Sequence, residues 1–243
     1  MSQFPITLKP FGNNAILIEW PQRVDASILQ DILTFQDFLR DRLEDTWEMV
    51  PAYNSLTLIQ LRSNFDQDQM HKQLLDWYSV AKQDISLQRY VWKIPVCYDL
   101  EFGIDLPALT KTLALSIEEL IEQHTTHIYT VYGIGFLPGF MYLGGLPKVL
   151  ETPRRKSPRL HVKKGAVGLA AKQTGIYPQD SPGGWNIIGS CPVPMFNPNS
   201  KNPCFVSVGD KVQFTPIERA EYELRKIEAE VGIYAPQKKE LHA

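Results

Sequence analysis

The chain has 243 residues, of which 44% are hydrophobic and 21% are charged, as in an ordinary folded protein and unlike a disordered one. Its 25 Lys and Arg residues against 27 Asp and Glu residues give a net charge of −2, which gives no support to general nucleic-acid binding. No apolar run approaches the roughly 18 residues of a membrane-spanning helix. Residues 1–10 lack the basic and apolar regions of a secretory signal. We therefore expect a cytoplasmic protein with no membrane or nucleic-acid partner.

The first 97 residues alternate between the apolar periods of strands and helices. We predict strands at 15–20, 47–52, 56–61 and 90–97. Between these strands we expect two helices, one capped by Asp25 and the other by Asp66. The order β-α-β-β-α-β is the split βαβ, or ferredoxin-like, arrangement. The sequence thus predicts an N-terminal α+β domain of residues 1–97.

Two more helices are predicted at 105–115 and 116–123, the second beginning with a capping box of Ser116 and Glu119. His124 and His127 follow it, three positions apart. No third ligand stands near them, and Thr125 and Thr126 are expected to end the helix. We therefore favour satisfied surface or interface histidines and expect no metal site.

Glycine and proline gather in the second half of the chain. Eleven of the 15 glycines lie between positions 133 and 189, and ten of the 18 prolines lie between positions 138 and 203. These residues favour turns and interrupt helices. The shift predicts a second, turn-rich and mainly β domain over residues 98–243, with a boundary near residues 94–99.

Three cysteines, Cys97, Cys191 and Cys204, are far apart and form no CxxC pair. An odd number of isolated cysteines argues against a disulfide framework and against a cysteine-based zinc site. We expect all three to be packing residues in a reducing compartment.

A basic segment, residues 152–179, contains no acidic residue and carries seven cations. They are Arg154, Arg155, Lys156, Arg159, Lys163, Lys164 and Lys172. Concentrated positive charge attracts anions, and arginine suits bidentate capture of a carboxylate or phosphate. A solvated loop, or a face docked on an acidic partner, explains the same charge equally well.

Aromatic residues recur among the glycines of this half: Tyr129, Tyr132, Phe136, Phe140, Tyr142, Tyr177 and Trp185. They can line a pocket for a flat ligand, but the packed core of a small β-barrel with tight corners explains them more simply. The dinucleotide fingerprint, the phosphate-binding loop and the nucleophile elbow are all missing from the sequence. A site completed by another protein chain is therefore expected.

The run GFLPGFMYLGGL at residues 135–146 resembles a hallmark of the family of kinase A inhibitors, 5-oxoprolinase B subunits and allophanate hydrolase subunit 1 proteins. Further blocks match in the family order over about 90 residues: 152–155, 158–159, 165–170, 173–178, 181–185, 188–189, 194–196, 209–210 and 214–217. Family members often carry Gly-Gly where Ala171 and Lys172 stand here.

This resemblance implies a C-terminal cyclophilin-like β-barrel domain, of the carboxyltransferase subdomain C and D type, with a C-terminal helix. It also implies an enzyme subunit with little or no activity alone. With a C subunit, of the allophanate hydrolase subunit 2 type, and an A subunit, it would convert 5-oxoproline to glutamate while ATP is hydrolysed. ATP is then the cofactor, bound at the assembled complex. Inhibition of a sensor histidine kinase and a carboxyltransferase role on urea-derived substrates stay open as alternatives.

Within the matching blocks, cations can stabilise developing charge, amides can bind a lactam and rings can pack on it. The candidate substrate-binding residues are Arg154, Arg155, Lys172, Gln173, Tyr177, Trp185, Asn186, Phe136 and Phe140. No catalytic residue is assigned.

Overall fold

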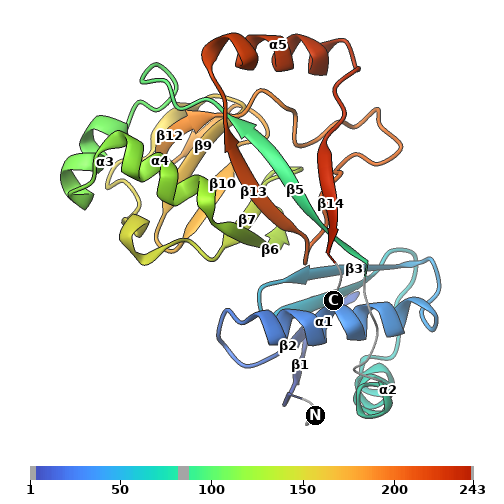
Figure 1. Cartoon of the computed structure of the whole chain (residues 1–243). Helices are drawn as coiled ribbons and strands as arrows, with labels where there is room; N and C mark the ends of the chain where they lie inside the picture. Colours follow the sequence, from blue (N-terminus) through green and yellow to red (C-terminus); the bar gives the residue numbers. More distant parts are fainter. Residues whose placement is uncertain (1–3, 82–87, 242–243) are drawn as a thin grey trace. The chain divides into compact units, whose positions relative to one another are not determined.

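The computed structural model describes residues 4–81 and 88–241, which form two compact units on either side of the gap between these ranges (Figure 1). Each unit has its own cluster of buried apolar side chains. No helix in the described ranges is long and apolar enough to cross a membrane.

The first unit is an antiparallel sheet with two helices. Its strands pair in the order β1, β2, β4, β3. The elements are β1 (Thr7–Pro10), β2 (Ala15–Glu19), α1 (Ala26–Arg40), β3 (Trp47–Ala52), β4 (Ser55–Gln60) and α2 (Gln67–Val80). Both predicted helix caps are confirmed, because the Asp25 carboxylate accepts from the Ser27 amide and that of Asp66 from the Gln69 amide.

Among the described residues of this unit, one carboxylate is buried in the core. Asp31 on α1 accepts a hydrogen bond from the Trp20 indole at 2.7 Å and another from the Tyr78 hydroxyl. Because an unpartnered carboxylate is costly to bury, these two donors allow Asp31 to lie among aromatic rings. The contact fixes α1 and α2 against the sheet.

The second unit contains a larger, mostly antiparallel sheet. Its main ladder runs β5, β13, β6, β7, β10, β9, β12, and β14 pairs with the free side of β5. Only β5 and β13 pair in parallel; the other ladders described are antiparallel. The strands are β5 (Arg89–Val96), β6 (Ile128–Ile134), β7 (Met141–Gly144), β9 (Ala166–Ala170), β10 (Gln173–Ile176), β12 (Asn186–Ser190), β13 (Lys211–Pro216) and β14 (Gln237–Leu241).

A separate ribbon and three helices complete this unit. The ribbon pairs β8 (Arg159–Val162) with β11 (Ser181–Gly183). The helices are α3 (Leu106–Leu113), α4 (Ile117–Thr126) and α5 (Arg219–Glu230), and a short 3-10 turn η1 spans Lys148–Leu150. In Figure 1, α3 and α4 lie on one side of the sheet and α5 across one end of it.

The finer fold prediction is not confirmed. The strand predicted at 90–97 was assigned to the N-terminal ferredoxin-like unit, but β5 pairs with β13 and β14 of the second unit. No continuous ladder of described residues closes the second sheet into a barrel, because β12 and the end of β5 are joined by a single bridge between Cys97 and Ser190. The observed class is a mixed α+β fold with mostly antiparallel pairing.

His124 is placed differently from the expected surface position. It is fully buried near the end of α4 and stacks on Phe214. Thr174 donates its hydroxyl proton to the Gly168 carbonyl, so it accepts from His124 Nε2 at 2.9 Å. His124 Nδ1 then accepts from the Tyr98 hydroxyl at 2.7 Å. No cluster of metal-ligating side chains is found in the described residues, and this histidine is a neutral core residue.

The pH dependence of stability tests this assignment. Burial lowers the pKa of His124 from 6.5 to about 3, so below pH 6.5 the unfolded chain binds a proton that the folded chain does not. The free energy of unfolding should therefore fall by about 1.4 kcal/mol between pH 7.5 and 5.5 through this group. Urea unfolding at both pH values measures the difference.

The variant His124→Gln should be less stable at both pH values and should lack this part of the pH dependence. The exposed His127→Gln serves as the control and should retain it. An unchanged pH dependence in His124→Gln would show that the histidine is not buried in its neutral form.

Candidate functional site

The basic segment, residues 152–179, divides into inward and outward cations. Arg155 and Arg159 both reach a buried acid, Asp105. Arg154, Lys156, Lys163, Lys164 and Lys172 are exposed. The segment is therefore neither a wholly solvated loop nor a single anion pocket.

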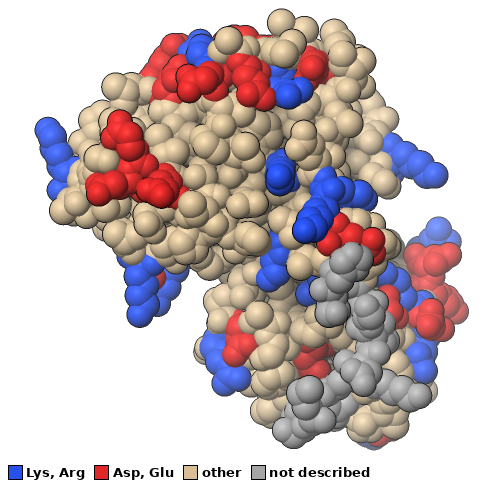
Figure 2. All heavy atoms as spheres, in the orientation of Figure 1, with Lys and Arg blue, Asp and Glu red and all other residues tan. Residues whose placement is uncertain are grey.

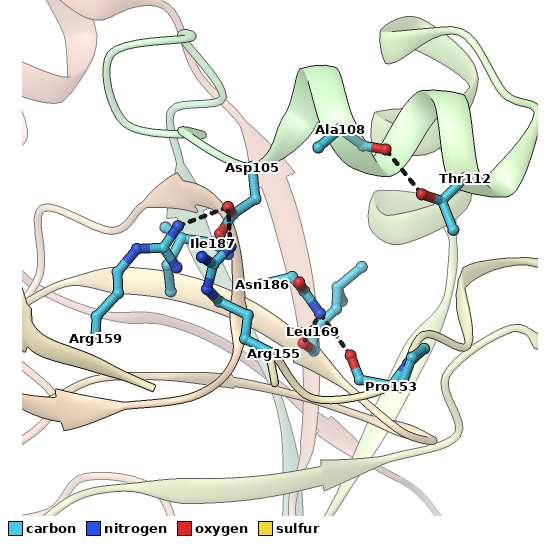
Figure 3. A network of polar contacts seen from close by, with 9 residues as sticks. All are labelled: Asp105, Ala108, Thr112, Pro153, Arg155, Arg159, Leu169, Asn186 and Ile187. Atoms are coloured by element: carbon cyan, nitrogen blue, oxygen red, sulfur yellow. Dashed lines mark hydrogen bonds and ion pairs between the residues drawn. The ribbon is translucent and has the colours of Figure 1, made fainter. Parts of the chain in front are cut away.

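Asp105 is the centre of a network of polar contacts (Figure 3). Its Oδ1 accepts from Arg155 Nη1 at 3.0 Å and from Arg159 Nη2 at 2.6 Å. Its Oδ2 accepts from the backbone amide of Ile187 at 2.6 Å. Only 5% of Asp105 is exposed, so these charge-assisted bonds form where water competes little.

Backbone contacts hold the network in place. The amide of Asp105 donates to the Ile187 carbonyl, and the amide of Arg155 donates to the Gly184 carbonyl. Asp105 stands at the start of α3, yet its side chain does not cap that helix. It ties the helix instead to β12 and to the basic segment.

The Asn186 amide is also engaged within the fold. Its Nδ2 donates to the carbonyl of Pro153 at 2.9 Å and to that of Leu169 at 3.3 Å. These contacts join β12 to the start of the basic segment (Figure 3). Both N–H bonds of this side-chain amide are therefore used within the fold. Neither is free to donate to the ligand amide that we predicted Asn186 to bind.

Three of the predicted aromatic residues come together. Phe140 lies edge-on to Tyr177 at 5.6 Å and to Trp185 at 5.5 Å between ring centroids. All three side chains are buried, and such edge-to-face pairs stabilise a core. We call Phe140, Tyr177 and Trp185 the aromatic cluster; it is a packed core, as the simpler of the two interpretations predicts.

Glycines make room for this cluster. A Cβ on Gly183 would lie 2.3 Å from the Tyr177 hydroxyl oxygen, and one on Gly175 would lie 3.1 Å from the Trp185 ring. The family-type glycines of β10 and β11 therefore allow backbone to approach rings closely, because only hydrogen fits at their α carbons.

The other predicted residues do not join one pocket. The ring centroids of Phe136 and Phe140 are 5.9 Å apart, but Phe136 is 70% exposed. The φ of Phe136 is 69°, a backbone conformation that few residues other than glycine favour. Gln173 is half-buried at the start of β10, and Lys172 is exposed in the turn before it. In that turn Ala171 has a φ of 52°. This left-handed conformation favours glycine, the residue that members of the resembling family often carry at this position.

Two hollows open beside the basic segment. The large groove, about 690 Å³, runs between the basic segment, residues 191–198 and α5, and Lys163, Lys164 and Tyr177 line it. The small cavity, about 240 Å³, lies beside Arg159 and Ile187. Both are bordered by Phe102, Lys163, Lys164 and Tyr222, so they adjoin.

Helix α5 forms a wall of the large groove and is fastened at its first turn. Arg219 pairs with Glu101 at 2.8 Å and with Glu223 at 2.9 Å, and lies over the Phe102 ring. The Tyr222 hydroxyl lies 3.1 Å from the Ser190 hydroxyl. Figure 2 shows acidic and basic side chains interleaved at the top of the molecule, where Figure 1 places α5.

The cysteines offer no nucleophile in the described residues. Burial raises the pKa of the Cys191 thiol to about 12 and also raises the pKa values of Cys97 and Cys204. These thiols stay protonated at neutral pH and are therefore unreactive. Burial likewise raises the pKa of Tyr177.

Sequence reasoning missed the residues that organise this region. In the sequence, Asp105 is recognisable only as the start of a predicted helix, and Arg159 is one of seven cations in the basic segment. No local pattern indicates a role for any residue of α5. An acid 50 residues from Arg155 carries no local signal of its partner. The one available hint was that seven cations without an acid need a counter-charge from elsewhere in the chain.

Comparison with known proteins gives consistent matches. The family described as carboxyltransferase domain, subdomain C and D, matches residues 6–206. The 5-oxoprolinase B subunit of Bacillus subtilis (strain 168) is 33% identical over 91% of this chain and 97% of its own length. The protein of the same name from Haemophilus influenzae is 36% identical over 86% and 97%.

Solved structures agree on the fold. TTHA0988 has a TM-score of 0.74 and 32% identity, over 84% of this chain and 40% of that one. The Kluyveromyces lactis urea carboxylase has a TM-score of 0.80 at 17% identity, over 97% of this chain and 24% of that one. The present chain thus spans less than half of either of these longer proteins.

Asp105→Asn should lower the free energy of unfolding by about 2–4 kcal/mol, because two guanidinium groups lose their shared counter-charge. Glu223→Gln removes one partner of the exposed ion pair with Arg219 and should cost about 0–1 kcal/mol. Chemical denaturation of the two variants measures both. Equal losses would mean that the Asp105 network contributes no more than a surface ion pair.

Gly183→Ala should destabilise the fold by about 1–3 kcal/mol, because the new methyl group overlaps the Tyr177 hydroxyl. Gly135→Ala is the matched control, since a Cβ there meets no atom within 4 Å. Thermal unfolding and near-UV circular dichroism report stability and ring packing. A Gly183→Ala protein as stable as the control would contradict the close packing described here.

Proposed function

The chain belongs to the family of carboxyltransferase domains, subdomains C and D, and from that premise we propose that it is the B subunit of an ATP-dependent 5-oxoprolinase. The observation that carries the proposal is the 33% identity to the Bacillus subtilis 5-oxoprolinase B subunit over 97% of that protein. A match over nearly the whole of both chains supports a shared role better than a match to one domain.

We propose that the chain acts with a C subunit of the allophanate hydrolase subunit 2 type and with an A subunit. The described residues supply basic and aromatic side chains beside a groove but no thiolate and no metal cluster. Such a site can bind and position an anionic substrate, while the reacting groups come from a partner protein. Little or no activity of the isolated chain follows from this proposal.

The reaction that we propose opens the lactam of 5-oxoproline to glutamate while ATP is hydrolysed. A lactam carbonyl is unreactive, so transfer of phosphate to its oxygen would activate the carbon for water. That transfer depends mainly on positioning and on stabilisation of negative charge. Lys163, Lys164, Arg219 and Lys226 are the cations among the described residues that line the large groove, and under this proposal they contribute to stabilisation of that negative charge.

Several finer points belong to the same proposal. ATP binds at the assembled complex, and the protein acts in the cytoplasm. Arg154, Lys172 and Gln173, which are partly or fully exposed, remain candidates for contact with substrate. The division into a ferredoxin-like domain (1–97) and a cyclophilin-like domain (98–243) stays a prediction, and the pairing of β5 with β13 favours a limit before Arg89.

A second candidate is a carboxyltransferase role on urea-derived substrates. It is favoured by the likeness of the fold to the Kluyveromyces lactis urea carboxylase. At 17% identity that likeness shows the fold alone, and the identity to the 5-oxoprolinase B subunits is about twice as high. We therefore prefer the proposal that the substrate is 5-oxoproline.

Phosphate release with 5-oxoproline and ATP tests the proposal. The chain alone, the chain with the C subunit, and the chain with both the A and C subunits are assayed in parallel. Turnover is expected only in the complete mixture and should disappear when the present chain is omitted. Proline, which has the ring and carboxylate but no lactam, is the control substrate and should release no phosphate.

Full turnover by the chain alone would contradict the need for partners. A complete mixture that is inactive on 5-oxoproline but active on urea with bicarbonate would favour the second candidate.

A further inference from the structure

The small cavity beside Arg159 is bordered by more positive than negative charge. Three cations, Arg159, Lys163 and Lys164, line it. Among the described residues that border it, Glu101 is the one acid. Glu101 already pairs with Arg219 at 2.8 Å. A hollow lined by more cations than acids raises the local concentration of anions.

The Asp105 network adds to this imbalance. One carboxylate serves two guanidinium groups, Arg155 and Arg159, so the triad keeps a net charge of about +1. The Nη1 atom of Arg159 is buried and has no hydrogen-bond partner within the described ranges. A buried donor without an acceptor is costly, so Asp105 satisfies this guanidinium only in part.

The remaining walls suit a small molecule with an apolar part. Ile104, Val162, Ala166 and Ile187 provide apolar surface. The hydroxyl groups of Ser190 and Tyr222, which lie 3.1 Å apart, border the same space. The volume of about 240 Å³ accommodates one small ring with its substituents and is below the roughly 300–1,000 Å³ of common drug-sized pockets.

We propose that the small cavity binds the carboxylate group of a small-molecule substrate, with Arg159, Lys163 and Lys164 holding the anion. This inference rests on the proposed function, under which the ligand is 5-oxoproline, the only anionic group of which is its carboxylate. The ring lies on the apolar wall, and the lactam faces the adjoining large groove. The cavity is distinct from the aromatic cluster, to which the sequence pointed.

Ligand titration of the full chain by calorimetry tests the site, with 5-oxoproline, glutamate and inorganic phosphate as probes. We expect 5-oxoproline to bind, and the double variant Lys163→Gln/Lys164→Gln to weaken that binding at least tenfold. Lys148→Gln/Lys156→Gln is the matched control, because it removes two exposed cations that border neither hollow. It should bind as the unmodified chain does.

A second variant, Arg159→Lys, keeps the charge and loses the planar fork, and should weaken binding of 5-oxoproline while the Asp105 network retains a cation. Thermal unfolding confirms that each variant is folded. Equal weakening by the two double variants would mean general electrostatic attraction and would overturn the site. Tighter binding of phosphate than of 5-oxoproline would overturn the assignment to a carboxylate.

Assays of the complete enzyme separate this inference from the proposed function. If the unmodified mixture turns over 5-oxoproline and Lys163→Gln/Lys164→Gln leaves its KM unchanged, the site is wrong and the function stands. If the unmodified mixture is inactive while the isolated chain binds 5-oxoproline through these lysines, the function is wrong and the site stands.

Discussion

The sharing of one buried carboxylate by two arginines is the interaction on which the second unit depends. Asp105 receives both guanidinium groups and the Ile187 amide, and so joins α3, β12 and the basic segment. Without it, the segment would repel itself and lose its anchor to the sheet. With it, two cations are held inward and the neighbouring lysines remain at the border of the hollows. The same carboxylate therefore organises both the fold and the distribution of charge at the candidate site.

Local patterns predicted much of the secondary structure. The caps at Asp25, Asp66 and Ser116 and the apolar periods of α1, α2 and α4 depend on neighbours within four positions, and the structure confirms them. The pairing of strands depends on partners far along the chain. Nothing near residue 90 shows that β5 pairs with β13, more than 100 residues later, so local sequence did not indicate the sheet to which this strand belongs.

The candidate site shows the same division. Glycines beside aromatic residues predicted close approach of backbone to rings, and Gly175 and Gly183 meet Trp185 and Tyr177 in that way. The charge of the basic segment predicted a need for anions, but the first anion is the protein's own Asp105. The rest depends on burial: His124 is inside rather than at the surface, and the aromatic cluster is packed in the core, with Tyr177 at the edge of the large groove. Burial of single polar residues follows from tertiary packing, which local sequence does not encode.

A double-mutant cycle between Asp105 and Arg159 measures the central contact directly. The free energy of unfolding is determined for Asp105→Asn, Arg159→Gln and the double variant, with a parallel cycle of Asp105→Asn and the exposed Lys156→Gln. The account predicts a coupling of about 0.5–3 kcal/mol between Asp105 and Arg159, and additivity within about 0.5 kcal/mol for the parallel cycle. A coupling to Arg159 no larger than that to Lys156 would show that Asp105 does not organise the basic segment.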